Sequence, residues 1–331
     1  MSGEPLAQRV YQLLSDGQRH AGTSLASCCG VSRNAVWKAV EELRGAGVEV
    51  QSIAHRGYRI AHASELLDAA RIAAAMPDAI RARLRAGECI WRTGSTNLDL
   101  LQREPGLPGT FDFLTAECQT QGRGRRARQW FAPPCAAICL SLTWNFGALP
   151  AHPGALSLAV GVCALRALAN IGVQGVTLKW PNDLTIHGGK LGGILIELRA
   201  EAGGPAYVVI GLGLNVTLSE PLRREIETTG TRAVDLYQLG VARADRNRIV
   251  AELLASIVQG MEQYESHGFS AFAAEWRVAD SLAGKTVIVN AEGIHVTGHA
   301  CGVDIDGALC VQTPTGLQRF VTGDVSVRAG T

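Results

Sequence analysis

The chain has 331 residues, of which 47% are hydrophobic and 18% are charged, with a formal net charge of +1. This length and composition predict a folded protein of two or three domains and exclude a mainly disordered chain. A net charge so close to zero also excludes attraction of the whole molecule to nucleic acid or to an anionic membrane. Such contacts would have to come from a local patch.

The cysteines, the amino terminus and the apolar segments indicate in which cellular compartment the protein works. The nine cysteines are scattered without the paired spacing of a metal site, so buried, reduced thiols are expected. The amino terminus has no basic-then-apolar signal, and the apolar segment 155–171 is interrupted by Arg166. We therefore expect a cytoplasmic protein that does not span a membrane.

Residues 1–62 are predicted to form a winged helix-turn-helix domain. Apolar residues recur at helical spacing in three short segments, and Gly30-Val31 form the turn between the second and the third. Two β-prone segments follow, at 48–50 and 58–60, and are expected to form a two-stranded wing. This order of elements is typical of DNA-binding modules.

The third predicted helix has a polar face that suits DNA. Its donors lie away from the apolar stripe and can reach phosphates and base edges in a major groove. The candidate DNA contacts are Ser32, Arg33, Asn34, Trp37, Lys38 and, at the turn of the wing, Arg56. Small three-helix units also serve as dimerisation or lid domains. Here the order of the elements, rather than their charge, favours DNA binding.

The rest of the chain is predicted to hold a linker and two further domains. Residues 63–88 have a helical pattern broken at Pro77 and are expected to be a linker helix. Residues 89–276 mix strand and helix patterns, which indicates an α+β domain on one mixed sheet. Residues 277–331 contain short strands and an Asp-Gly hairpin signal at 306–307, which predict a small SH3-like β-barrel. The expected fold class is therefore α+β multidomain. In the central domain the clearest predicted strands are 111–117, 137–144, 177–180 and 207–210, and the clearest helices are 155–170 and 246–266.

The most informative segment is residues 121–130, which we call the glycine–arginine loop. It carries four arginines and two glycines within seven residues, has no carboxylate, and ends at Trp130. Glycine permits unusual backbone conformations and close approach to a ligand, and arginine suits carboxylate and phosphate oxygens. Three interpretations stay open on this loop alone: closure over a small phosphorylated anion, a solvated basic loop, or a nucleic-acid patch.

Three further clusters accompany this loop. Residues 94–97, Gly-Ser-Thr-Asn, can cap a helix and bind a polar head group, and taken alone they favour a plain cap. Residues 179–183, Lys-Trp-Pro-Asn-Asp, gather a cation, an indole, an amide and a carboxylate around a proline turn. In residues 188–197, Lys190 stands between glycine pairs before an apolar strand, which predicts an inward-pointing ammonium. The combination and order of these clusters point to one chemistry.

Together these motifs resemble the family of bifunctional biotin–protein ligases and biotin-operon repressors. The matching signatures are residues 122–126, 179–184 and 190–195, with Ser-Thr-Asn at 95–97 and Gly-Leu-Gly-Leu-Asn at 211–215. The resemblance runs from the winged helix through the carboxy-terminal barrel. Lipoate ligases share the catalytic fold but lack this pairing of the glycine–arginine loop with Lys-Trp-Pro-Asn-Asp.

The resemblance implies a reaction in two steps and a second role in transcription. With Mg²⁺, biotin and ATP would give biotinyl-5′-AMP and pyrophosphate. The biotinyl group would then pass to a lysine of the biotin carboxyl carrier protein of acetyl-CoA carboxylase. Bound biotinyl-AMP would favour a homodimer that binds operator DNA and represses biotin biosynthesis genes. The resemblance assigns no Mg²⁺ ligands in this chain.

Matching the motifs position by position implies roles for individual side chains. Lys190 and Arg125 are the expected catalytic residues, because two anions must meet and cations must neutralise the charge at phosphorus. The implied biotin-binding residues are Ser95, Thr96, Asn97, Gln119, Gly122, Arg123, Gly124, Arg125, Lys190 and Gly193. Those implied for ATP and the adenylate are Arg123, Arg126, Trp130, Lys179, Asn182 and Asn215. The family commonly has glycine where this chain has Ala127, so a positive φ there would strain the loop.

Two other functions are weighed against this one. A lipoate-type acyl ligase would be distinguished by the acid that drives exchange between ATP and pyrophosphate. A non-catalytic, ligand-sensing transcription factor has no need of three arginines at a phosphorus atom, so Lys190 and the glycine–arginine loop disfavour it.

Overall fold

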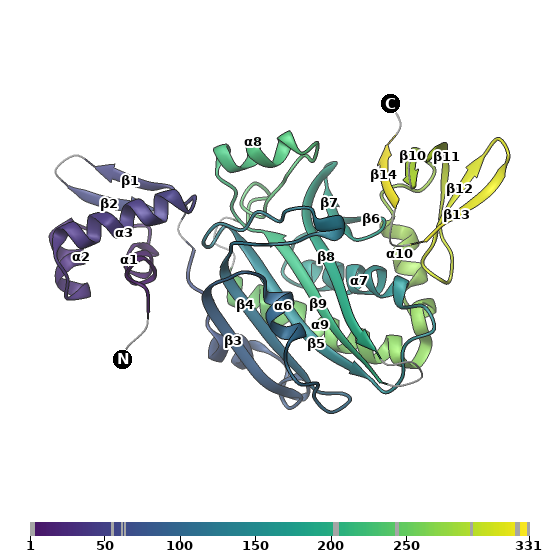
Figure 1. Ribbon diagram of the computed structural model, residues 1–331, viewed down its shortest axis with the longest axis horizontal. Coiled ribbons are helices and arrows are strands. Elements are labelled where there is room, and N and C mark those ends of the chain that lie inside the picture. Colours follow the sequence, from purple (N-terminus) through teal and green to yellow (C-terminus); the bar gives the residue numbers. More distant parts are fainter. Residues whose placement is uncertain are drawn as a thin grey trace.

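The computed structural model describes residues 4–53, 56–60, 62, 64–200, 205–241, 245–291, 294–321 and 325–329. Three units follow one another along its longest axis: helices with a wing, a central sheet with its helices, and a small carboxy-terminal sheet (Figure 1). The α+β multidomain class predicted from the sequence is confirmed.

The amino-terminal unit is a winged helix-turn-helix. Gly30 ends the second helix with a φ of 65°, in the left-handed region that glycine adopts without strain. Ser32 then caps the third helix, because its side chain accepts a hydrogen bond from the Ala35 backbone N–H at 3.2 Å. The elements are α1 (Leu6–Leu14), α2 (Gly22–Cys29), α3 (Arg33–Gly45), β1 (Val50–Ile53) and β2 (Gly57–Ile60).

The segment predicted as a linker helix belongs to the central core. It contains α4 (Ala69–Ala75), α5 (Asp78–Arg81) and the start of β3 (Leu84–Thr93). Pro77 separates the two short helices, and Ile72 and Ile80 are buried in the central apolar cluster. The prediction of one helix over 63–88 is therefore corrected. The last residues of that range are a strand because they pair in parallel with β4, a tertiary contact that no local pattern contains.

The central unit is a seven-stranded mixed sheet in the order β3-β4-β5-β9-β8-β7-β6. The β3–β4 pair is parallel and the other neighbours are antiparallel. The remaining strands are β4 (Phe111–Gln119), β5 (Ala137–Phe146), β6 (Thr177–Lys179), β7 (Asp183–Ile186), β8 (Gly189–Ala200) and β9 (Ala206–Asn215). The helices are α6 (Thr96–Leu101), α7 (Leu156–Asn170), α8 (Glu220–Thr228) and α9 (Arg246–His267).

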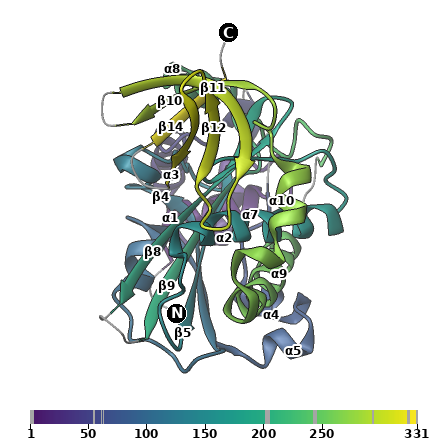
Figure 2. The ribbon, with the colours of Figure 1, turned by 90° about the vertical axis from the view of Figure 1, so that its right-hand side faces the viewer.

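The two faces of the sheet are covered by different helices, and successive residues of β4 show which helices pack on each face. Phe113 packs in the large cluster with α7 and α9, whereas Leu114 packs with Leu100 of α6 on the opposite face. Figure 2 shows α9 running along the first of these faces. The α6 face is the one that carries the site described below.

Pro153–Asn170 is long and apolar enough to cross a membrane, by length and composition, with a mean hydropathy of 1.3. In the fold 61% of this segment is buried, and most of α7 lies in the central core. Helices buried in the core of folded proteins can be as long and as apolar, so packing against the sheet and α9 accounts for the apolar run.

The carboxy-terminal unit is a small antiparallel sheet in the order β13-β12-β11-β10-β14. The predicted hairpin turn at 306–307 is present, with Gly307 at a φ of 80°. Trp180 of the Lys-Trp-Pro-Asn-Asp turn donates its indole N–H to Gly307 O at 3.0 Å, which joins this unit to the central one. The predicted boundary at 276/277 falls inside a helix. The elements are α10 (Ala273–Ala279), β10 (Thr286–Ala291), β11 (Ile294–Val303), β12 (Leu309–Thr313), β13 (Gly316–Phe320) and β14 (Val325–Ala329).

Candidate active site

A cavity of about 560 Å³ lies on the α6 face of the central sheet. Small residues of the sheet line it, Ser141 on β5 and Gly211 and Gly213 on β9, and they let Asn97 and Trp130 pack close to the strands. A Cβ at Gly211 would lie 2.3 Å from Asn97 Oδ1, and one at Gly213 would lie 2.5 Å from the Trp130 ring. Close packing therefore requires glycine at both positions.

Nearly all residues predicted to bind biotin, ATP or the adenylate line this cavity. They are Ser95, Thr96, Asn97, Gln119, Arg123, Gly124, Arg125, Arg126, Trp130, Lys179, Asn182, Lys190, Gly193 and Asn215. The exception is Gly122, which is buried at the base of the glycine–arginine loop, where a Cβ would lie 2.4 Å from Trp130 O. The fold thus brings together motifs that are far apart in the sequence, as a common ligand would require.

The polar start of α6 is held by Gln119 rather than by a helix cap. Ser95 stands at the N-cap position, but its side chain makes no capping hydrogen bond. Gln119 Oε1 instead accepts the Thr96 backbone N–H at 2.8 Å and the Thr96 hydroxyl at 3.1 Å. The plain cap that residues 94–97 favour in isolation does not form, and Ser95 lines the cavity while only 4% exposed.

The glycine–arginine loop folds back as a short hairpin at the cavity. The Gly124 N–H donates to Arg128 O at 2.7 Å, and the Trp130 N–H donates to Gly122 O at 2.8 Å. The turn η1 (Arg125–Ala127) forms the tip of this hairpin, enclosed by the Gly124–Arg128 bond. The hairpin keeps the arginine side chains in the lining of the cavity.

The left-handed conformation of this turn occurs at Arg126, with φ 57° and ψ 39°. An L-residue in this region carries about 1 kcal/mol or more of strain. The sequence prediction concerned Ala127, where a positive φ would explain the family's glycine. The strain is found one residue earlier, on an arginine whose side chain lines the cavity.

Lys190 brings its ammonium to the cavity, as the flanking glycines predict. Its Nζ lies 2.6 Å from Asp183 Oδ1 and 6.0 Å from the centroid of the Trp130 ring, and its side chain is 27% exposed. The Lys190 N–H donates to Arg232 O at 2.8 Å, so the backbone beneath the side chain is also held. This lysine is therefore positioned at both ends.

Two of the residues predicted to bind the adenylate hold strands in place. Asn215 Nδ2 donates to Lys190 O at 3.3 Å and to Val234 O at 3.1 Å. Asn182 Nδ2 donates to Ile194 O at 2.6 Å. Because the Asn215 amide hydrogens face the backbone, this side chain presents an oxygen rather than a donor to a ligand.

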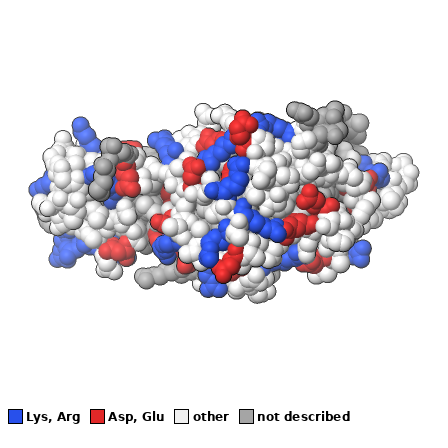
Figure 3. Space-filling model, turned by 90° about the horizontal axis from the view of Figure 1, so that it is seen from below, with Lys and Arg blue, Asp and Glu red and all other residues white. Residues whose placement is uncertain are grey.

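The described lining of the cavity has a large excess of cations. Among the described lining residues the carboxylate is Asp183. The cationic residues are Arg123, Arg125, Arg126, Arg128, Lys179, Lys190 and Arg232. On the molecular face in Figure 3, by contrast, acidic and basic side chains are interspersed. The excess is thus local, and it favours a ligand with several negative charges.

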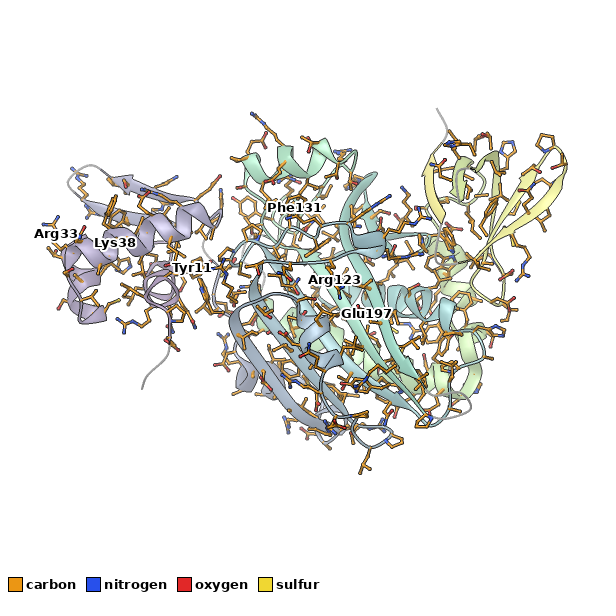
Figure 4. All side chains as sticks on the ribbon, in the orientation of Figure 1. Tyr11, Arg33, Lys38, Arg123, Phe131 and Glu197 are labelled. Atoms are coloured by element: carbon orange, nitrogen blue, oxygen red, sulfur yellow. The ribbon has the colours of Figure 1, made fainter. Side chains whose placement is uncertain are left out.

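Three residues at this site were not predicted from the sequence. Ser141 is fully buried and donates to Asn97 Oδ1 at 2.6 Å; a small hydroxyl residue between two leucines of an apolar strand was the signal for it. Arg232 follows α8 and belongs to no motif. Glu197 accepts from Arg123 Nη2 at 2.9 Å and lies beside it in Figure 4. The spacing of the motif around Lys190 gives no sign of that contact.

The predicted DNA-binding residues lie on the outside of the winged helix. All six are exposed: Ser32, Arg33, Asn34, Trp37, Lys38 and Arg56. Figure 4 shows Arg33 and Lys38 on the amino-terminal unit, away from the central sheet. Trp37 is 50% exposed, which is unusual for a large aromatic side chain and consistent with a contact surface.

Comparison with known proteins follows the same division of the chain. The model for the biotin/lipoate A/B protein ligase family matches residues 95–215, an HTH domain model matches 6–59, and a biotin protein ligase C terminal domain model matches 283–328. The bifunctional ligase/repressor BirA of Salmonella typhimurium is 33% identical over 320 residues, which cover 97% of each chain. The protein of the same name from Escherichia coli is 31% identical over 329 residues and 99% of each chain.

Two solved structures share the fold over about three quarters of this chain. A mutant biotin protein ligase from Aquifex aeolicus in complex with biotin superposes with a TM-score of 0.64 at 25% identity, covering 74% of this chain and 99% of that one. The ligase from the same organism in complex with biotin and ATP has a TM-score of 0.62 at 24% identity over 74% and 100% of the two chains, and so shares the fold. The chain belongs to the family of bifunctional biotin protein ligases and repressors.

Proposed function

We propose that this protein is an ATP-dependent biotin–protein ligase that also represses transcription. Biotin and ATP give biotinyl-5′-AMP and pyrophosphate, and the biotinyl group is then transferred to a lysine of the biotin carboxyl carrier protein of acetyl-CoA carboxylase. The observation that carries the proposal is the cavity, which joins Lys190 and the arginines of the glycine–arginine loop to a polar pocket at α6.

The first step brings two anions together. A carboxylate oxygen of biotin attacks the α-phosphorus of ATP and pyrophosphate leaves, so negative charge builds up around phosphorus. Lys190 and Arg125 both line the cavity and are assigned to neutralise that charge. The ammonium of Lys190 is held by Asp183 at 2.6 Å, which lowers the entropy lost in placing it.

The biotin head is assigned to the polar pocket at the start of α6. Its ureido group has one acceptor and two donors, which match hydroxyl and amide side chains. Ile194 adds apolar surface to the same cavity for the fused rings. The biotin-binding set is Ser95, Thr96, Asn97, Gln119, Gly122, Arg123, Gly124, Arg125, Lys190 and Gly193.

The nucleotide is assigned to the part of the cavity lined by the glycine–arginine loop and the Lys-Trp-Pro-Asn-Asp turn. Cations there suit the phosphates, and the face of Trp130 suits a purine ring. The set for ATP and the adenylate is Arg123, Arg126, Trp130, Lys179, Asn182 and Asn215.

Mg²⁺ accompanies ATP in this proposal, and the carboxylate of Asp183 fits such an ion. Mg²⁺ usually binds one or two carboxylates together with substrate phosphates, rather than a full set of protein ligands. Asp183 lines the cavity, and no cluster of three or more metal-binding side chains exists in the described part of the chain. Asp183 and the phosphates of ATP would hold the ion, which supplies further neutralisation of phosphate charge.

Repression is assigned to the exposed face of α3, with operator DNA as the ligand. A palindromic operator needs two copies of the winged helix, so we propose a homodimer favoured by bound biotinyl-AMP. β8 pairs with β7 only as far as Gly193, and among the described residues no strand covers the outer edge of residues 195–200. An open strand edge of this kind can add a strand from a second copy. Because both proposed partners, the carrier protein and DNA, are cytoplasmic, we expect this protein in the cytoplasm.

The ligase is tested by mixing purified protein with ATP and biotin. We expect biotin-dependent exchange between ATP and pyrophosphate, and a bound biotinyl-AMP detectable by mass spectrometry. Exchange driven better by lipoate or octanoate would support a lipoate-type ligase instead. A bound acid without exchange would support a sensor that performs no chemistry.

The repressor is tested by operator binding with and without biotin and ATP. We expect tighter binding when both are present, and weaker binding after Arg33→Ala combined with Lys38→Ala. Lys285→Ala, an exposed lysine in the carboxy-terminal unit, is the control. Operator affinity that does not change with ligand would contradict adenylate-dependent repression.

A further inference from the structure

Glu197 links two residues of the biotin-binding set that come from different parts of the chain. Its Oε2 accepts a hydrogen bond from Asn97 Nδ2, and its Oε1 accepts one from Arg123 Nη2, both at 2.9 Å. Asn97 belongs to α6, Arg123 to the glycine–arginine loop and Glu197 to β8. Figure 4 shows Arg123 and Glu197 next to each other over the central sheet. One carboxylate thus ties the loop and the helix to the strand.

The first consequence concerns the amide of Asn97, which is buried with 4% exposure. An ionised carboxylate accepts hydrogen bonds and donates none, so the NH₂ end of the amide must face Glu197. The oxygen end then faces Ser141, whose hydroxyl donates to it at 2.6 Å. Asn97 Nδ2 also donates to Leu195 O at 3.2 Å, so Glu197 and this backbone oxygen together fix which end of the Asn97 amide points where, and Glu197 accepts the shorter bond. This orientation leaves one lone pair of Oδ1 for a donor in the cavity.

The second consequence concerns the guanidinium of Arg123. Arg125, Arg126 and Lys190 line the same cavity and repel it. The contact with Glu197 opposes this repulsion and keeps the Arg123 side chain against the sheet. The pair is half-exposed, with 38% exposure for Arg123 and 23% for Glu197, so it is an orienting contact rather than a buried core pair.

We propose that Glu197 is a positioning residue for biotin. It holds the Asn97 amide and the Arg123 guanidinium in the orientation that receives the ureido head, and it acts through them. Asn97 and Arg123 line the cavity, whereas Glu197 stands behind them and is not part of the lining. This inference rests on the proposed assignment of Asn97 and Arg123 to biotin.

The test measures biotin KM, ATP KM and kcat of the full chain by pyrophosphate exchange. Glu197→Ala removes two hydrogen bonds that involve a charged group, so we expect biotin KM to rise about tenfold or more. kcat should stay within about twofold, because Lys190 and Arg125 are untouched. ATP KM should rise less than biotin KM, because only one of the two residues that Glu197 holds, Arg123, is also assigned to the nucleotide. Glu197→Gln keeps a neutral acceptor but also adds a donor next to Asn97, so its biotin KM should lie between those of the wild type and Glu197→Ala.

The matched control is Glu275→Gln, which removes the partner of Arg166 in another half-exposed ion pair, between α10 and α7. We expect it to leave both KM values unchanged. An unchanged biotin KM in Glu197→Ala would overturn the proposal. Equal rises in both KM values, with a lower unfolding temperature, would also overturn it, because they indicate a role in the fold alone.

Asn97→Ala and Arg123→Ala in the same assay distinguish failure of the positioning role of Glu197 from failure of the proposed biotin site. If both raise biotin KM and Glu197→Ala does not, the positioning role fails while the biotin site stands. If neither raises biotin KM, the biotin head is bound elsewhere, and the assignment of the site and the role of Glu197 fall together.

Discussion

Arg246 and Glu117 form an ion pair that solvent does not reach, with Arg246 Nη2 2.7 Å from Glu117 Oε2 and side-chain exposures of 0% and 5%. Glu117 Oε1 also accepts the Leu67 N–H at 2.6 Å, and Arg246 Nη1 donates to Glu65 O at 3.0 Å. Glu117 lies on β4, two residues before Gln119 of the candidate site. The pair therefore joins the segment after the winged helix to the strand and to α9, directly behind the site.

Removing one partner of this pair should destabilise the central unit strongly. Arg246→Met leaves the Glu117 carboxylate buried without its counter-ion, which typically costs about 3–5 kcal/mol. The measurement is the denaturant midpoint of the unfolding transition of the central unit. Arg224→Met is the control, since Arg224 pairs with Glu220 in solvent at 76% and 62% exposure, and such pairs contribute about 0–1 kcal/mol. Equal shifts in the two variants would contradict the role of burial.

Lys190→Ala should abolish formation of the adenylate while the protein stays folded. The ammonium is the cation placed between Asp183 and the Trp130 ring, and loss of one such stabilising group typically lowers the rate about 10²–10³-fold. Pyrophosphate exchange measures the loss, and circular dichroism checks the fold. Lys285→Ala should exchange like the wild type. Exchange retained in Lys190→Ala would remove this lysine from the mechanism.

Arg125→Ala should weaken retention of the intermediate. Acyl adenylates hydrolyse in water, and the hairpin of the glycine–arginine loop lies where it can shelter one. Loss of one charge-assisted contact should speed release of free biotinyl-AMP about tenfold. Release is followed by chasing the loaded protein with unlabelled ligand, with Arg224→Ala as the control. If Arg125→Ala releases the adenylate at the wild-type rate, its assigned role is wrong.

Cys139 should resist alkylation although it lines the cavity. Burial raises the pKa of this thiol to about 12, so at about pH 8 only about one molecule in ten thousand carries the reactive thiolate. The thiol stays neutral below its pKa and becomes reactive only as the pH rises toward it. Iodoacetamide should modify the exposed Cys28 and Cys301 first, as read by peptide mass spectrometry. Modification of Cys139 as fast as Cys28 would show that the site opens to solvent.

Much of the winged helix and of the cavity was predictable because its causes are local. The turn after α2 needs a residue in the left-handed region, and Gly30 is one; the next helix needs a cap, and Ser32 is one. Likewise, the glycine pairs on either side of Lys190, and Gly122 next to Arg123, are adjacent or nearly adjacent in sequence to the cations whose backbone they leave uncrowded. Residue type and short spacing are enough to recognise such features.

Other features depended on contacts between residues far apart in the chain. Residues 84–88 became a strand only by parallel pairing with β4, which overrode the helical pattern expected for 63–88. The amide of Asn215, expected to face the adenylate, donates to the backbone at Lys190 and Val234 because the sheet places it there. No spacing rule relates these pairs.

The sequence by itself determined which chemical groups this protein brings to its reaction, because motifs of residue type and spacing are local and survive without coordinates. Only the tertiary structure decided which of those groups face the cavity and which donate their hydrogen bonds to the backbone of neighbouring strands. It also decided which carboxylates pair with the cations. Partners such as Glu197 for Arg123, or Glu117 for Arg246, meet across 74 and 129 positions of the chain. The physical reason is that burial and strand pairing, not proximity along the chain, select them.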